Sequence, residues 1–440
     1  MITKLVSKTL KVLMAIAIRA RGDPTCKFTS LAHLLTEDFL KECFRELKRG
    51  KSPGIDGVTV GEYTKKLDVN IANLVARLKA KQYKPQPVLR VYIPKPNGEK
   101  RPLGIPAVED KIVQMAIKKI LEAISEQDFI DTSYGFRPHR SCHDALKRLD
   151  KVIMTSPVNF VVDMDISKFF DTVDHKKLME CLKQRVVDPS LLQLIGRFLK
   201  SGIIEEGKYF DTEMGTPQGG ILSPVLANVY LHYALDKWFE EEVKPQLLGS
   251  AQLIRYADDF VVCFEKEIEA RIFGDELRRR MGKFGLTISE EKSKIIEFGR
   301  CACTRAKQYG WKCETFDFLG FTHFCDKSRW GNFKLGRKTS RKKFRQKMAD
   351  MSAWLKGIRN RRELEEWWKS LGLKLIGHYR YYGMSGNIRS LKNFYHHVVR
   401  LAFKWINRRS QRKSYTWDQF NRFLQYNPLP KPKIYHSLYT

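Results

Sequence analysis

Apolar side chains recur at two different spacings along the first 300 residues of the chain. Spacings of three and four residues predict helices at 36–48 and 112–124. Short runs rich in β-branched residues predict strands at 88–93, 159–166 and 260–264. Because helices and strands are interleaved, we expect an α+β fold around a mainly antiparallel sheet.

Local signals refine these elements. Residues 99–103 are expected to pair back on 88–93 as a hairpin, and 178–199 to form one helical run. We expect Ser223 to cap a helix with Pro224 at its first position. From residue 336 onward only helical spacing remains, which predicts an all-α C-terminal region.

Positive charge is concentrated in that C-terminal region. The 440 residues carry 80 Lys+Arg against 49 Asp+Glu, a net charge of +31. Residues 300–440 hold 32 of the cations and 8 of the acids, so +24 of the excess lies there. A folded basic region of this kind predicts a polyanionic partner, with nucleic acid first and an anionic membrane surface second.

Hydropathy and cysteine content bear on location. No apolar stretch approaches the roughly 18 residues of a membrane span, so we expect a soluble protein without a membrane partner. Residues 1–21 are expected to form a basic amphipathic helix.

Nine cysteines without regular spacing indicate reduced thiols in the cytosol. The cluster of Cys301, Cys303, Cys313, His323 and Cys325 lacks the paired spacing of a zinc site, so free thiols are the favoured interpretation.

Acidic residues at strand ends indicate chemistry. Asp163 and Asp165 share one face of the predicted strand at 159–166, and Asp258 and Asp259 are adjacent in a predicted tight turn. Taken alone, each motif is better interpreted as solvated acids without a special role. Together, on neighbouring strands, Asp165, Asp258 and Asp259 would form a site for divalent cations. Two Mg²⁺ ions about 3.5–4 Å apart are what nucleotidyl transfer requires.

The order and spacing of several motifs carry a family resemblance. The motifs are IPKP (93–96), RPLGIP (101–106), YGFRP (134–138), DISKFFD (165–171), GTPQGG (215–220), YADD (256–259) and FLGF (318–321). This set resembles the group II intron-encoded reverse transcriptases, also called maturases, from about residue 28 to the C-terminus. The resemblance implies a right-hand polymerase that copies RNA, with a primer and dNTPs as further substrates.

The resemblance also implies roles for individual residues. Asp165, Asp258 and Asp259 are the implied catalytic and metal-binding acids, with the backbone carbonyl of Ile166 as a further ligand of two Mg²⁺ ions, for which Mn²⁺ can substitute. The implied nucleotide contacts are Lys95 and Arg101 for the triphosphate, Phe170 as the gate against a ribose 2′ hydroxyl, Gln218 near the templating base and Lys292 as proton donor to pyrophosphate. FLGF would support the primer grip.

Each nucleotide contact has an ordinary alternative. Lys95 and Arg101 equally suit an exposed hairpin, Gln218 a turn and Lys292 the surface of a helix start. Phe170 equally suits the core, and its choice over the adjacent Phe169 rests on spacing from Asp165.

The resemblance divides the chain into an N-terminal extension (1–50), fingers (51–158), palm with a helical insertion (159–299), a connection (300–336) and a thumb or maturase domain (337–440). The thumb would contact the template-primer duplex and the intron RNA. Its expected nucleic-acid contacts are Arg341, Lys342, Lys343, Arg345, Lys347, Arg408, Arg409, Arg412 and Lys413.

Three functions remain open at this point. The first is an RNA-directed DNA polymerase of a bacterial, cytoplasmic retroelement that also assists splicing and mobility of its own group II intron RNA. The second is an RNA-binding splicing cofactor with secondary polymerase activity, which the complete set of acids disfavours. The third is a stand-alone reverse transcriptase of a defence or other element. We expect a compact form without an endonuclease domain.

Overall fold

The structure is a computed structural model that describes residues 7–94, 100–361, 363–409 and 414–438. The chain divides into two compact units. The first contains residues 1–145 and 162–295, and the second contains residues 146–161 and 296–440.

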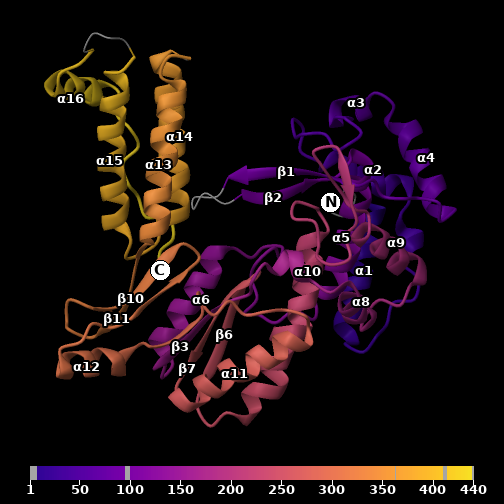
Figure 1. Ribbon diagram of the computed structural model, residues 1–440, viewed down its shortest axis with the longest axis horizontal. Helices are drawn as coiled ribbons and strands as arrows, with labels where there is room; N and C mark the ends of the chain where they lie inside the picture. The colour runs from indigo at the N-terminus through magenta and orange to yellow at the C-terminus, as the bar shows by residue number, and fades with distance from the viewer. Residues whose placement is uncertain (1–6, 95–99, 362, 410–413, 439–440) are drawn as a thin grey trace, which may run out of the picture. The chain divides into compact units, whose positions relative to one another are not determined.

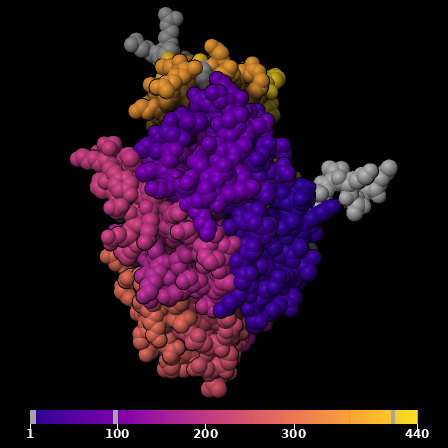
Figure 2. Space-filling view, turned by 90° about the vertical axis from the view of Figure 1, so that its right-hand side faces the viewer, coloured from indigo at the N-terminus to yellow at the C-terminus, as the bar shows by residue number. Residues whose placement is uncertain are grey.

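Helices at the beginning of the chain pack around one central helix in the first unit (Figure 1). α5 (Val108–Ser125) contacts both α1 (Lys8–Gly22) and α2 (Glu37–Arg45). α3 (Val60–Thr64) and α4 (Leu67–Lys79) complete this region, and α4 contacts α2. Figure 2 shows the resulting surface, with indigo residues of the chain start beside violet residues that follow them. The basic helix predicted at residues 1–21 is confirmed from Lys8 onward as α1, and residues 1–6 of the prediction lie outside the described residues.

A four-stranded sheet follows, in the order β2-β1-β4-β5. Its first two strands, β1 (Val88–Pro94) and β2 (Lys100–Ile105), pair antiparallel, which confirms the predicted hairpin. β4 (Ile203–Glu205) pairs parallel with β1, and β5 (Lys208–Phe210) pairs antiparallel with β4.

The prediction of one helical run at 178–199 is wrong. The segment contains α8 (His175–Lys183) and α9 (Pro189–Leu199). Asp188 separates them, because its carboxylate accepts hydrogen bonds from the backbone N–H groups of Ser190 and Leu191 and so starts a new helix at Pro189.

The predicted cap at Ser223 is also wrong. α10 (Ser223–Leu231) begins at this residue, and Leu222 is the residue before the helix. The Ser223 hydroxyl instead donates to the carbonyl of Pro217 at 2.8 Å, so it joins the helix to the GTPQGG loop. π-helical turns at His232–Asp236 and Phe239–Val243 continue the chain beyond α10.

A second four-stranded sheet has the order β6-β7-β3-β8. β6 (Ala251–Tyr256) and β7 (Asp259–Phe264) form an antiparallel hairpin that contains the strand predicted at 260–264 and the predicted tight turn, and β3 (Phe160–Asp165) lies beside β7. β8 (Lys294–Glu297) is the outer strand beside β3. The short helix α7 (Phe169–Thr172) follows β3, and α11 (Glu267–Lys283) packs against β7 (Figure 1).

The second unit combines a small sheet with helices. Its strands β9 (Thr315–Phe318), β10 (Phe321–Lys327) and β11 (Phe333–Thr339) have the order β11-β10-β9. The helices are α12 (Arg300–Tyr309), α13 (Arg341–Ile358), α14 (Leu364–Tyr382), α15 (Ile388–Ile406) and α16 (Trp417–Tyr426). α6 (Cys142–Thr155) precedes β3 and contains residues of both units.

The helices of the second unit begin later than predicted. β11 continues to Thr339, and Ser340 then caps α13 by accepting from the backbone N–H of Lys343. Strand pairing with β10 over the whole of β11 outweighs the helical spacing read from residue 336 onward. Trp367, Trp368, Tyr379 and Tyr382 are buried in the core, whereas Tyr381 is 38% exposed. Within the described ranges, no helix has the length and hydropathy required to cross a membrane.

Candidate active site

Two carboxylates lie in the turn between β6 and β7. Tyr256 pairs with Asp259 across the hairpin, so Ala257 and Asp258 form its tip. Ala257 has a φ of 58°, a left-handed conformation that is uncommon for a residue with a Cβ. Asp165 ends the neighbouring strand β3. The sheet order therefore brings the three predicted acids to one edge of the sheet.

The electrostatics of Asp258 show that these acids interact. Burial raises the pKa of Asp258, and the negative charge of Asp165 raises that pKa further. The positive charges of Arg101 and Arg255 act in the opposite direction. A half-buried carboxylate whose ionised form is disfavoured by burial and by a second carboxylate nearby fits a site that binds cations.

A buried ion pair lies beneath the turn. Arg255 and Asp236 are both fully buried, and the Arg255 guanidinium donates from Nε and Nη2 to the two carboxylate oxygens at 2.7 and 2.5 Å. Arg255 Nη1 also donates to the carbonyl of Ala257 at 2.9 Å. The strained residue of the turn is thus held by an arginine that the sequence motif places just before it.

The YGFRP segment packs against the same turn. The backbone N–H of Tyr134 donates to the Arg255 carbonyl at 2.9 Å. A Cβ atom on Gly135 would lie 2.2 Å from the backbone nitrogen of Ala257, so only glycine fits there. Asn228 links the two sides, since its amide donates to the Gly135 carbonyl at 2.7 Å and accepts from Arg255 at 3.1 Å. Arg255, Asp236 and Asn228 are absent from the sequence prediction, and the arginine directly before YADD was the available signal.

Lys292 and Ile166 lie beside Asp165. Lys292 Nζ forms an ion pair with Asp165 Oδ2 at 2.8 Å, so a cation already contacts one of the predicted metal ligands. Ile166 forms a bridge with Ile288, whose two flanking hydrogen bonds use the N–H of Ser167 and the carbonyl of Asp165. The Ile166 carbonyl is therefore not used by this pairing.

Phe170 and Gln218 line a common cavity of 610 Å³ with Arg90 and parts of β2 and the GTPQGG loop. Phe169, by contrast, is buried, with its ring 6.4 Å from that of Tyr230. The Gly104 N–H donates to the Gln218 carbonyl at 2.6 Å, which joins this loop to β2. Arg101 is exposed on β2, within electrostatic range of Asp258, while Lys95 lies outside the described residues.

Residues 93–323, more than half of the chain, match the family described as reverse transcriptase (RNA-dependent DNA polymerase). The chain belongs to the reverse transcriptase family. Its assignment as an RNA-directed DNA polymerase is thereby confirmed. Enzymes of this family use divalent metal ions, in keeping with the three acids at the strand edge.

The curated relatives support the same family assignment. Protein YkfC of Escherichia coli strain K12 is 32% identical over 379 residues, which are 78% of this chain and 96% of that protein. Group II intron-encoded protein LtrA of Lactococcus lactis subsp. cremoris is 34% identical over 307 residues, 67% of this chain and 51% of LtrA. Nuclear intron maturase 4, mitochondrial, of Arabidopsis thaliana is 29% identical over 151 residues, 34% of this chain and 19% of that protein. The chain thus spans about half of LtrA, and its predicted kinship with the intron-encoded group is confirmed.

The FLGF motif of this reverse transcriptase forms the tight turn between β9 and β10. Leu319 and Gly320 have φ values of 49° and 79°, the pattern of a two-residue hairpin turn. Tyr381 donates to the Leu319 carbonyl at 3.1 Å, and the Ser340 N–H donates to the Gly320 carbonyl at 3.0 Å. The turn is therefore attached to α14 and to the start of α13.

The described thumb contacts that the sequence predicts lie at the start of α13 and just after α15. Arg341, Lys342, Lys343, Arg345 and Lys347 are all exposed on the first two turns of α13. Arg408, just after α15, is exposed, and its guanidinium lies 5.7 Å from the ring centre of Trp405, whereas Arg409 is half-buried. Arg412 and Lys413 lie outside the described residues.

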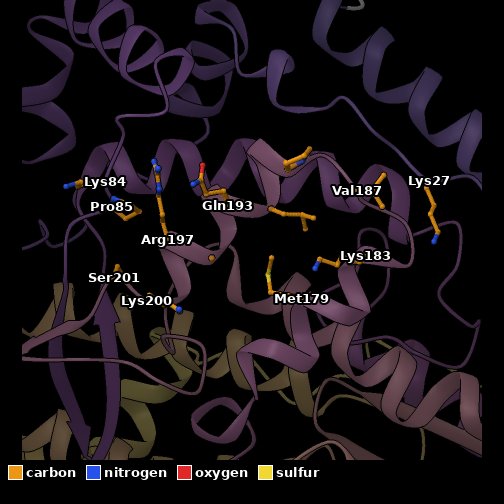
Figure 3. A pocket seen from close by; sticks show the side chains of 13 residues that line it. Lys27, Lys84, Pro85, Met179, Lys183, Val187, Gln193, Arg197, Lys200 and Ser201 are labelled. Carbon is orange, nitrogen blue, oxygen red and sulfur yellow. The ribbon is translucent and has the colours of Figure 1, made fainter.

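A separate groove of 1080 Å³ in the first unit contains none of the predicted site residues (Figure 3). Met179 and Lys183 line it from α8, and Gln193 and Arg197 line it from α9. Its lining contains five cations and no acid; the cations are Lys27, Lys84, Lys183, Arg197 and Lys200. This groove is a cationic surface distinct from the acidic edge of the sheet.

Proposed function

We propose that this chain copies an RNA template from a DNA or RNA primer by nucleotidyl transfer at Asp165, Asp258 and Asp259, with two Mg²⁺ ions, for which Mn²⁺ can substitute. The observation that carries this proposal is the position of Asp165 beside Asp258 at one edge of the β6-β7-β3-β8 sheet, where the charge of Asp165 raises the pKa of Asp258. Carboxylates so arranged supply the oxygen ligands that Mg²⁺ prefers.

Asp165, Asp258, Asp259 and the Ile166 carbonyl would hold the metal ions. When bound, two Mg²⁺ ions activate the primer 3′ hydroxyl and neutralise charge on the departing pyrophosphate. The Lys292 ammonium would leave its ion pair with Asp165 and donate a proton to the pyrophosphate.

Residues around the 610 Å³ cavity would select the nucleotide. The exposed guanidinium of Arg101, with Lys95, would bind the triphosphate through charge-assisted hydrogen bonds. The Phe170 ring would exclude ribonucleotides by steric clash with their 2′ hydroxyl, and Gln218 would lie against the base pair. The proposed domains are those of the right-hand polymerase, with fingers at 51–158, palm at 159–299, connection at 300–336 and thumb at 337–440, after an extension at 1–50.

Primer extension on an RNA template tests the polymerase proposal. Asp165→Asn should abolish extension at every Mg²⁺ concentration, because it removes a carboxylate ligand of the metal ions rather than only weakening their binding. Lys292→Gln should retain metal-dependent extension at a reduced rate, since the acids remain. Full extension by Asp165→Asn would refute the proposed metal site.

We further propose that the chain is a maturase for its own group II intron RNA. Five exposed cations on α13 support this role, because RNA is recognised largely through its phosphates and shape. A bacterial cytoplasm would supply that RNA together with the dNTPs.

Splicing of the intron that flanks the gene tests the maturase role. The chain should lower the Mg²⁺ concentration at which that intron RNA splices in vitro, and an Asp258→Asn variant should do so equally well. Splicing unaffected by either protein, with polymerase activity intact, would favour a stand-alone reverse transcriptase. Splicing assistance without primer extension by the wild-type chain would favour a splicing cofactor alone.

A further inference from the structure

Three cysteines from separate segments of the second unit meet at one point. Cys303 lies on α12, Cys313 lies just before β9 and Cys325 lies on β10. Their sulfur atoms are all within 4.8 Å of one another. Cys301, on the same helix as Cys303, is exposed and lies outside this group.

The spacing of the sulfur atoms matches a metal centre. Tetrahedral zinc with Zn–S bonds of about 2.3 Å places its thiolates about 3.8 Å apart. The sulfur atoms of Cys303 and Cys313 are 3.9 Å apart. Only a small movement of Cys325 would complete three corners of such a tetrahedron.

Two groups beside the sulfur atoms would act on thiolates that bind a metal ion. The backbone N–H of Gly299 is directed at the sulfur of Cys325 at 3.5 Å. Amide groups that donate to metal-bound thiolates orient the ligands and stabilise their charge. Lys327 lies close enough to act on Cys303 electrostatically, and its positive charge would offset the net charge of −1 on Zn²⁺ with three thiolates.

We propose that Cys303, Cys313 and Cys325 bind one structural Zn²⁺ ion, whose fourth position is open to water or another small ligand. The ion would connect α12 and the chain before β9 to β10. It is independent of the proposed magnesium site, because the ligands are thiolates rather than carboxylates. The sequence argued against zinc because no two of these cysteines have paired spacing, and only the fold brings them together.

The separation of the ligands along the chain suggests what the ion would do. Cys313 lies ten positions after Cys303, and Cys325 lies twelve positions after Cys313. A cross-link over such loops removes conformational freedom from the unfolded chain. We therefore expect zinc to raise the melting temperature of the full chain.

The test is zinc stoichiometry of the full-length protein, purified under reducing conditions and incubated with Zn²⁺ alone. We expect one tightly held Zn²⁺ per chain by elemental analysis after buffer exchange. Cys303→Ser, Cys313→Ser and Cys325→Ser should each lose it, and Cys301→Ser should keep it as the matched control. With Co²⁺ as probe, only the wild type and Cys301→Ser should show thiolate-to-cobalt charge-transfer absorption.

A stability measurement guards against variants that simply misfold. A chelator should lower the melting temperature of the wild type and of Cys301→Ser but leave Cys313→Ser unchanged, while all four variants retain primer extension in Mg²⁺. No zinc on the reduced wild type would overturn the proposal. So would equal zinc retention by Cys301→Ser and Cys313→Ser, or a Cys303–Cys313 disulfide in the reduced, zinc-treated chain.

Discussion

Asp258 carries an electrostatic cost that metal binding would explain. Burial and the charge of Asp165 raise its pKa in the folded chain. The folded state therefore holds this proton more tightly than the unfolded state. The stabilising contribution of the protonated Asp258 carboxyl group is complete below the unfolded pKa of about 3.9. It is lost as the pH rises through the higher folded pKa. At neutral pH the ionised carboxylate destabilises the metal-free fold.

Replacing Asp258 should accordingly stabilise the metal-free chain. In the presence of a chelator at pH 7, Asp258→Asn should melt a few degrees above the wild type, because a neutral amide avoids the cost of the buried charge. Addition of Mg²⁺ should raise the melting temperature of the wild type more than that of the variant. Asp275→Asn, at a 77% exposed carboxylate on α11, serves as control. A lower melting temperature for Asp258→Asn under chelation would contradict the electrostatic account.

Phe169 and Phe170 offer a matched pair of substitutions. Phe170 lines the 610 Å³ cavity and Phe169 lies in the core. Phe170→Ala should admit ribonucleotides with little effect on stability. Phe169→Ala should cost about 3–5 kcal/mol of stability yet preserve the preference for dNTPs. Steady-state incorporation of dNTP against rNTP measures the preference of both variants, and denaturant unfolding measures their stability. An unchanged preference in Phe170→Ala would place the gate elsewhere.

At this scale the sequence predicted the residues whose chemistry is unusual and missed those that support them. Acids in a tight turn have no structural reason to be adjacent, so Asp258 and Asp259 were identifiable. Asp236 and Asn228 are ordinary helical residues until the fold places them beneath Arg255. The sequence placed Cys303, Cys313 and Cys325 in a larger cluster but could not select these three, because their meeting depends on how α12 and β10 pack.

At the scale of elements, the β6–β7 hairpin depends on the helical segment beneath it. Arg255 is the link, since it joins Asp236 and Asn228 to the carbonyl of Ala257. Removing one member of a buried ion pair leaves the other charge without compensation, at a cost of about 3–5 kcal/mol.

We therefore expect Asp236→Asn to lower stability strongly and to slow primer extension, since the catalytic turn is then without its support. The control is Arg278→Gln on α11, whose ion pair with Glu290 is exposed and worth about 0–1 kcal/mol. Denaturant unfolding and primer extension measure the two effects. Equal stability of the two variants would show that the buried pair does not hold the turn.

The elements predicted correctly are those with unambiguous local patterns. The β1–β2 hairpin begins with an alternating strand, β7 is a short apolar run directly after a tight turn, and α5 has a continuous apolar face. The errors arose where a competing interaction decides. Asp188 divides 178–199 into two helices, Ser223 bonds to Pro217 rather than capping, and pairing with β10 extends β11 to Thr339.

At the scale of the whole molecule, the excess of positive charge should govern affinity for RNA. Binding to polyphosphates releases counterions, so affinity falls steeply with salt. Substituting Arg341, Lys342 and Lys343 with Gln should reduce the slope of log affinity against log salt by about 1 for each of these cations that binds a phosphate in the wild type. Lys369→Gln is the control, because that lysine pairs with Glu365 at 2.7 Å. An unchanged slope in the triple variant would place the duplex on another surface.

The most direct test of the central claim is primer extension on an RNA template by the double variant Asp258→Ala, Asp259→Ala. Binding of the template-primer duplex is measured on the same protein. The proposed metal site predicts that extension is abolished while duplex binding stays near the wild-type level, since the acids hold metal ions and not RNA. Extension that persists in the double variant would contradict catalysis by these carboxylates.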